Sequence, residues 1–514
     1  MAGGRGLSVT LAANVGSVLA QQLSIYGISL LTFGIIARLL TPIQLGLYAL
    51  VVSMVHLFSA AANLGIKRFG VWAISSRPEE GVRIFWACTM LALAFIALIS
   101  FAVTYVACLL RIFDVSNPSV DPYLFYTLLF LYSLKVYISC GLEGLRLFHR
   151  VTVYVSTGFL IYRILMIYAA LMGYGVTGIM AAWCVGEGIA IALILRDTLP
   201  RFTPFTLDYS LREVVLRSLP LTASDLVVAA LDWADRLVIS VYGYSSIAIF
   251  YIAATGTSAL TAIAQAVYSG TLPHLSESFH RGNPGEFSAE VRRIGKYIAL
   301  FASPIYILAM ALGQPTIIIL VGPQYLSATI VFQVMAFGLW ITSLSPLIHT
   351  ALIAAGRWVS LMYVMVAALA TDILFILIAF PYLGVVAAGI GRALLMAVSF
   401  ALALVIAQDV LDLDIDMAAI LKSMAASLLM AVIVIVMWTY VRHISLYPLY
   451  VLAGAAIYLG LIRLLRVVDV EDLAILYSSV PHRLIPAVKL VCRVLGVDAG
   501  EVERRASARL PAEK

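Results

Sequence analysis

Long apolar runs, separated by short polar connections, recur along the whole chain. An α-helix needs about 17–25 mostly apolar residues to cross the roughly 30 Å hydrocarbon core of a bilayer. Segments of this kind cover residues 12–37, 46–68, 84–110, 122–145, 153–172, 177–195, 214–241, 247–270, 294–313, 328–354, 359–380, 384–407, 418–440 and 447–465. The pattern predicts an all-α polytopic membrane protein with about fourteen transmembrane helices.

Polar residues inside these apolar segments follow helical stripes that occur twice in the chain. The first two helices carry Asn14, Gln21, Thr32, Ser53, His56, Asn63 and Lys67. About 203 residues later, the seventh and eighth helices carry Ser218, Asp225, Asp232, Arg236, Thr255, Ser258, Gln265 and Ser269. This repeat predicts two six-helix lobes in the same orientation, related by a pseudo-twofold axis along the membrane normal, plus two extra C-terminal helices.

The repeat also predicts the domain organisation. We expect an N-lobe over residues 1–200, a C-lobe over 201–409, two additional helices over 410–465, and a cytoplasmic tail over 466–514 with amphipathic and disordered parts. In carriers of this plan the polar path runs between the lobes. The residues predicted to line this central cavity are Asn14, Gln21, His56, Asn63, Ser258 and Gln265.

Composition and charge support this interpretation and add an orientation. Hydrophobic residues make up 63% of the chain and charged residues 12%, which excludes a soluble enzyme of this size. Of the 33 Lys and Arg residues, only Arg38, Arg111 and Arg442 fall in connections on one side of the membrane. Since cytoplasmic connections are rich in Lys and Arg, both termini are predicted to be cytoplasmic, in a protein of the plasma membrane. The same orientation accounts for the net charge of +6, so we expect no nucleic-acid partner.

No feature of the sequence points to catalysis or to a cofactor. The five cysteines form no Cys-x-x-Cys pair, and no phosphate-binding G-x-x-x-x-G-K-[ST] motif occurs. The predicted outer connections are short, which argues against a membrane glycosyltransferase or polymerase with a large external domain. We therefore expect a carrier that is not an enzyme, holds no metal and works as a monomer.

Charges deep in the membrane are costly and need a partner or a wet cavity. Arg163 and Glu187 lie at similar depth on either side of a tight turn, and Asp372 and Arg392 flank a second turn in the same way. We expect two ion pairs that fix their hairpins, with roles in gating or binding as the alternative.

Three further charged positions are candidates for transport chemistry. Lys135 has no acidic partner on its own helix, so an anionic head group, a wet cavity or an acid from another helix must satisfy it. Asp232 and Arg236 are four residues apart and can pair with each other. Asp225 has no cationic neighbour on its helix, so it is the better candidate for proton or sodium coupling, with Asp232 as the second.

Several short motifs resemble those of a known family. The segment from Phe33 to Pro42, followed by Gly46-Leu-Tyr48 and Asn63-Leu-Gly65, resembles the opening of polysaccharide-transport flippases, and Asp235-Arg236 and Gly322-Pro-Gln-Tyr325 resemble their second half. These proteins belong to the multidrug/oligosaccharidyl-lipid/polysaccharide exporter superfamily. The resemblance covers about residues 10–465.

The resemblance implies a two-lobed carrier that moves a polyprenyl-(di)phosphate-linked oligosaccharide from the cytoplasmic to the outer leaflet by alternating access. Basic cavity residues would then meet the lipid phosphates, and the candidates are Lys67, Arg68, Lys135, Arg163, Arg236 and Arg392. An ion-coupled multidrug antiporter, a lipid II flippase and, with less support, a glycosyltransferase remain alternatives. The sequence does not name the glycan, the polyprenol or the coupling ion.

Overall fold

The computed structural model describes residues 27–112, 120–206, 208–280, 284–411, 416–479 and 485–509. These residues form helices joined by short turns, with no strand among them. Within this part of the chain, eleven helices are long and apolar enough to cross a membrane, or twelve if one bent pair counts as a single span. The helix Gly27–Leu39 and the 37-residue helix α9 (Tyr244–His280) correspond to the two remaining predicted spans. The prediction of a polytopic all-α protein is confirmed.

The chain divides into two compact units, each with its own core. The N-terminal unit comprises residues 32–251 and 372–388, and the C-terminal unit contains residues 252–371 and the described part of 389–514. The helices of the N-terminal unit are α2 (Pro42–Asn63), α3 (Ile66–Ser76), α4 (Gly81–Leu109), α5 (Pro122–Gly144), α6 (Phe148–Leu171), α7 (Gly175–Thr198) and α8 (Leu211–Ser240).

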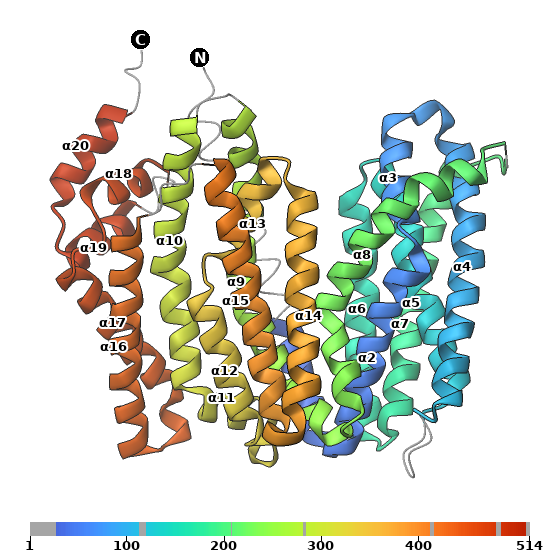
Figure 1. Cartoon of the computed structure of the whole chain (residues 1–514), viewed down its shortest axis with the longest axis horizontal. Coiled ribbons are helices and arrows are strands. Elements are labelled where there is room, and N and C mark those ends of the chain that lie inside the picture. The colour runs from blue at the N-terminus through green and yellow to red at the C-terminus, as the bar shows by residue number, and fades with distance from the viewer. Residues whose placement is uncertain are drawn as a thin grey trace. The chain divides into compact units, whose positions relative to one another are not determined.

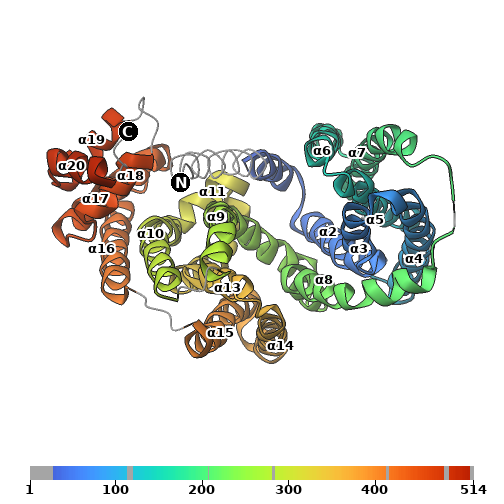
Figure 2. The ribbon, with the colours of Figure 1, turned by 90° about the horizontal axis from the view of Figure 1, so that it is seen from above.

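Helix α2 is the centre of the N-terminal unit. It packs against α4, α5, α7 and α8, and 72% of its apolar 18-residue stretch is buried inside the protein. Figure 2 shows α2 beside α5 and α8. Its start is fixed by sequence, because Thr41 caps the helix, Gln44 completes a capping box and Pro42 occupies the first turn. A polar residue on α2 therefore faces either another helix or an internal cavity.

The end of α2 departs from the predicted span over residues 46–68. Leu64 and Gly65 both adopt left-handed backbone angles, with φ of 43° and 64°, so the helix stops and α3 begins in a new direction. A single leucine in this conformation is uncommon, whereas glycine adopts it at little cost. The break places Lys67 and Arg68 on α3 rather than on α2.

Two glycines at the ends of α2 allow other backbone segments of the unit to approach closely. A Cβ atom added to Gly46 would lie 1.8 Å from the carbonyl oxygen of Tyr244, the first residue of α9. At the other end, a Cβ on Gly65 would lie 2.6 Å from the carbonyl oxygen of Ser218. The close approach therefore depends on glycine at both positions, and it places α8 in the N-terminal unit (Figure 1).

We expect Gly46→Ala to destabilise the protein by about 1–3 kcal/mol, since the new methyl group meets a backbone carbonyl that no side-chain rotation can move. The measurement is thermal unfolding of the purified protein in detergent. Gly188→Ala is the matched control, because no atom lies within 4 Å of its added Cβ and alanine is the better helix former. Equal melting temperatures for the two variants would contradict the prediction.

The C-terminal unit has a larger core formed by helices that follow one another in sequence. Its helices are the later part of α9, α10 (Pro284–Ala311), α11 (Gly313–Val321), α12 (Ala328–Ile341), α13 (Ser345–Ala354), α14 (Trp358–Leu383), α15 (Val385–Leu411), α16 (Met417–Val441) and α17 (Tyr447–Leu464). The predicted span over residues 328–354 is the bent pair α12 and α13, whose axes differ by 48°. The tip of the α14–α15 hairpin, residues 372–388, belongs to the N-terminal unit.

The tail is more ordered than the sequence suggested. Helices α18 (Val470–Ser479), α19 (Ile485–Leu495) and α20 (Ala499–Arg509) pack around a small core that includes Leu473, Val488 and Val502. Lys296 of α10 binds both Asp469 (2.9 Å) and Asp472 (2.7 Å), which ties this bundle to the membrane helices. The helix α20 is part of this bundle because its apolar residues Val502 and Ala506 are buried in the small core.

Candidate functional site

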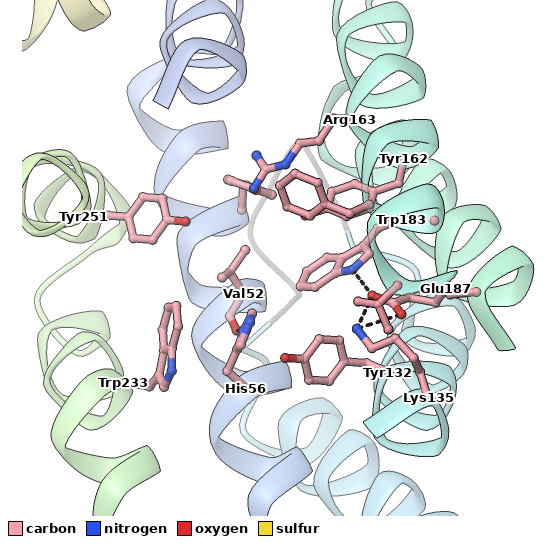
Figure 3. Close-up of a pocket in the computed structure, with 15 residues that line it drawn as sticks. Val52, His56, Tyr132, Lys135, Tyr162, Arg163, Trp183, Glu187, Trp233 and Tyr251 are labelled. Atoms are coloured by element: carbon pink, nitrogen blue, oxygen red, sulfur yellow. Dashed lines mark hydrogen bonds and ion pairs between the residues drawn. The ribbon is translucent and has the colours of Figure 1, made fainter. Parts of the chain in front are cut away.

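A cavity of about 270 Å³ lies inside the N-terminal unit (Figure 3). Five helices, α2, α5, α6, α7 and α8, contribute to its wall, and Tyr251 comes from the start of α9. The residues that line it are Tyr48, Val52, His56, Tyr132, Lys135, Val155, Gly158, Phe159, Tyr162, Arg163, Trp183, Glu187, Ala190, Trp233 and Tyr251. We call it the aromatic cavity, because seven of these fifteen residues are Tyr, Trp or Phe.

Helix α2 supplies one continuous face to this cavity because of its residue spacing. Tyr48, Val52 and His56 are four residues apart, so their side chains lie one above the other. The His56 Nδ1 lies 2.7 Å from the Val52 carbonyl oxygen, and its ring stacks on Trp233 with centroids 4.4 Å apart. His56 therefore lines a cavity inside the N-terminal unit, whereas the sequence predicted a place for it in a cavity between the lobes.

Glu187 is buried at the side of the aromatic cavity and is held by two partners. It accepts a hydrogen bond from the Trp183 indole nitrogen at 2.7 Å and pairs with the Lys135 ammonium group at 3.0 Å. The exposed fractions of the Lys135 and Glu187 side chains are 14% and 4%, so the pair is largely desolvated. The expected Arg163–Glu187 pair is therefore wrong, because Glu187 on α7 faces α5 and finds Lys135 there.

Arg163 reaches into the same cavity without an acidic partner among the described residues. Its guanidinium carbon lies 4.9 Å from the centre of the Phe159 ring and 5.1 Å from that of Tyr162. Its Nε atom is buried and makes no hydrogen bond. Figure 3 shows the guanidinium group directed between Tyr162 and Tyr251. Since the Lys135–Glu187 charges cancel, Arg163 gives the aromatic cavity a net positive charge.

A second cavity of about 560 Å³ adjoins the first, and we call it the charged cavity. His56 and Tyr132 line both cavities, and their ring centroids lie 4.8 Å apart. The other residues of the charged cavity are Ser59, Ala60, Asn63, Lys67, Arg68, Val71, Trp72, Val136, Glu143, Asp225, Val228 and Ala229. The His56–Tyr132 contact therefore separates two compartments of one polar region.

The charges of the second cavity are balanced in two pairs. Lys67 binds Glu143 at 3.0 Å, and Arg68 binds Asp225 at 2.8 Å. Asp225, for which no cationic neighbour was found on its own helix, thus has one on α3. Asn63 lines this cavity, and its amide group donates to the carbonyl oxygen of Ser59 at 2.9 Å.

Arg236 does not line either cavity, although it was a candidate for substrate binding. Its guanidinium group is buried and pairs with Asp235 at 3.0 Å, while its Nη1 also donates to the backbone carbonyl of Asp232. The expected contact with the Asp232 side chain is therefore replaced by Asp235, the preceding residue. Asp232 is also absent from both cavity walls.

The remaining candidates lie elsewhere or outside the described residues. Asn14 and Gln21 lie outside them, as does the side chain of Gln265. Ser258 is on α9 in the C-terminal unit, where its hydroxyl donates to the Ala254 carbonyl at 2.8 Å. Arg392 is on α15 in the same unit. The described residues contain no cluster of His, Cys, Asp or Glu suited to a metal ion.

Sequence reasoning missed the aromatic residues of the first cavity. Tyr132, Tyr162, Trp183 and Trp233 lie in apolar segments, where an aromatic residue ordinarily indicates packing. One local signal was present, since Trp183 and Glu187 are four residues apart on one helix and can bond to each other.

The long apolar helices and the polar region inside one helical unit define a multi-pass membrane protein. Among solved structures, the chain is similar to the lipid II flippase MurJ in an inward closed conformation, with a TM-score of 0.69 and 13% identity over 87% of this chain and 98% of that one. It is also similar to an inward-facing multidrug resistance MATE family transporter of the MOP superfamily, with a TM-score of 0.57 and 17% identity over 76% and 94%. At these identities the similarity shows a shared fold.

The family follows from the sequence. A family model described as "Polysaccharide biosynthesis protein" matches residues 35–330, which is more than half of the chain. The chain therefore belongs to this polysaccharide biosynthesis family. A comparison with curated protein sequences gave no match.

Proposed function

We propose that this protein is a flippase that moves a polyprenyl-(di)phosphate-linked oligosaccharide from the cytoplasmic to the outer leaflet of the plasma membrane. The observation that carries the proposal is Arg163, a cation inside an aromatic cavity with no acidic partner among the described residues. A desolvated guanidinium group favours an anionic ligand, and it binds phosphate in a bidentate geometry.

The two cavities suggest how such a head group would travel. With the termini on the cytoplasmic side, as the Lys and Arg distribution predicts, α3 is at the cytoplasmic end of α2 and Arg163 lies in the outer half of α6. The head group would enter the charged cavity, pass the His56–Tyr132 contact and reach Arg163, while the lipid tail remains in the bilayer. The charges of the charged cavity are paired with each other, so they would admit a polar ligand without binding it tightly. Arg163, which has no acidic partner among the described residues, lies beyond them in the aromatic cavity.

The test uses the full chain in liposomes with a fluorescent polyprenyl-diphosphate oligosaccharide placed in both leaflets. An enzyme or quencher added outside measures how much lipid is reached. Protein-dependent exposure of the inner pool, with the recovered lipid chemically unchanged, is the expected result. Exposure of lipid II alone would indicate a lipid II flippase, and efflux of cationic dyes alone would indicate a multidrug antiporter. Either outcome would overturn the proposal.

We further propose Asp225 as the site of ion coupling, since this acid of the charged cavity lies on α8 and its pair with Arg68 joins α8 to α3. A proton or sodium ion that competes with Arg68 for this carboxylate would loosen the contact between α3 and α8. We expect Asp225→Asn to bind substrate but to lose the acceleration of transport by an imposed pH or sodium gradient. Asp232→Asn is the matched control, because Asp232 lies on the same helix outside both cavities. Equal acceleration in the wild type and Asp225→Asn would exclude this role.

A further inference from the structure

We propose that the aromatic cavity binds a sugar ring stacked on Trp183, at a position distinct from the phosphate contact at Arg163. The inference rests on the proposed function and adds to it, because it divides the recognition of one head group between two sets of side chains. Trp183 would bind the sugar next to the phosphate, and Arg163 would bind the phosphate.

The chemistry of the cavity wall favours a sugar over a hydrocarbon chain or an inorganic anion. A pyranose ring has apolar C–H faces and polar hydroxyl edges, so it needs flat aromatic surfaces with polar groups around them. Here the cavity is lined by aromatic side chains and also by Lys135, Glu187 and tyrosine hydroxyl groups. Figure 3 shows the hydroxyl groups of Tyr132 and Tyr251 directed into the cavity. A hydrocarbon chain would offer no hydrogen-bond partner to the Tyr132 hydroxyl group.

Trp183 is held as a fixed platform by its surroundings. Its indole nitrogen donates to Glu187 at 2.7 Å, and Glu187 is itself held by Lys135. The Tyr162 ring is stacked beside the Trp183 indole, with ring centroids 6.0 Å apart. The Tyr132 ring contacts the indole edge to face, with centroids 5.8 Å apart. Glu187 is thus a positioning residue for the indole, because it accepts the hydrogen bond that fixes the orientation of the ring. A ring fixed in this way loses little freedom when a ligand stacks on it.

The size of the cavity limits what it can hold. About 270 Å³ is slightly below the range of roughly 300–1,000 Å³ that accommodates drug-sized ligands. The cavity therefore suits one sugar with its phosphate, not a whole oligosaccharide. Further sugars would lie in the adjoining charged cavity, which has about twice the volume.

The experiment measures binding of two probes to the full chain in nanodiscs. One probe is a short-chain polyprenyl diphosphate without sugar, and the other is the same lipid carrying one N-acetylglucosamine. We expect Trp183→Leu to weaken binding of the sugar-bearing probe about 5- to 100-fold, the range typical of a lost aromatic stacking contact. Binding of the sugar-free probe should stay unchanged. Trp183→Phe, which keeps an aromatic face, should retain most of the affinity, and its melting temperature reports folding.

The other outcomes distinguish failure of the sugar site from failure of the phosphate contact. Equal weakening of both probes by Trp183→Leu, or no weakening of either, would overturn the sugar site. Arg163→Gln is expected to weaken both probes alike. If Arg163→Gln changes neither probe while Trp183→Leu still discriminates between them, the phosphate assignment in the proposed function fails and the sugar site stands. Absence of binding of both probes to the wild-type protein would overturn both proposals.

Discussion

Replacing Arg163 with glutamine is expected to lower the rate of lipid-linked oligosaccharide transport by at least about 30-fold. Loss of one partner from a desolvated charge pair costs about 2–5 kcal/mol. The lower limit of about 2 kcal/mol corresponds to a rate that is about 30-fold lower. The protein should remain folded, because the wild-type guanidinium group makes no ion pair with a described residue whose loss would leave a buried acid behind. Arg163→Lys keeps the charge but not the bidentate geometry, so an intermediate rate is expected.

The measurement is the liposome assay described above, with initial rates normalised to the amount of folded protein. Arg150→Gln is a matched control, since Arg150 lies on the same helix, is 47% exposed and binds Asp197 away from both cavities. The prediction requires that Arg150→Gln transports like the wild type. Wild-type transport by Arg163→Gln would show that the cation of the aromatic cavity plays no part in recognition.

Removing either member of the Lys135–Glu187 pair is expected to destabilise the protein by about 3–5 kcal/mol, because the remaining charge is left buried without its partner. Lys135→Met and Glu187→Gln together should recover much of this loss, since no unpaired charge remains. Unfolding in detergent of the two single variants and the double variant gives the coupling energy directly.

The Arg150–Asp197 pair, in which the arginine side chain is 47% exposed, provides the comparison, with an expected coupling of about 1 kcal/mol or less. A coupling near zero for Lys135 and Glu187 as well would mean that each is solvated independently. In that case Lys135 would be available to bind substrate, as the sequence alone suggested.

The sequence predicted the helices well because each span is a local property of about twenty residues. It also placed His56 and Asn63 on a polar face of one helix, and both line cavities in the structure. Ser53, in the same stripe, is instead buried and bonds to the carbonyl of Ala49, which helical spacing alone does not reveal. A stripe therefore predicts a face of a helix but not the depth of the cavity beside it.

The partners of the charged residues were the harder part. Sequence reasoning compared residues on one helix or across one turn, and so it paired Arg163 with Glu187. The partners of Lys135 and Asp225 lie on helices that are distant in the chain, at α7 and α3. Which helices approach one another depends on packing around α2, and the left-handed turn at Leu64 and Gly65 that redirects α3 is not visible as a break in hydropathy.

The glycine contact between α2 and the start of α9 has a consequence for motion. At Gly46 the facing surface is the backbone of Tyr244, so no side chains interlock there, and the two segments can separate without changing a rotamer at this point. A methyl group at Gly46 would penalise the closed arrangement and leave a separated one unaffected. Gly46→Ala should therefore shift the population of conformers toward those in which the start of α9 has moved away from α2, and a cysteine pair placed across this contact should cross-link more slowly.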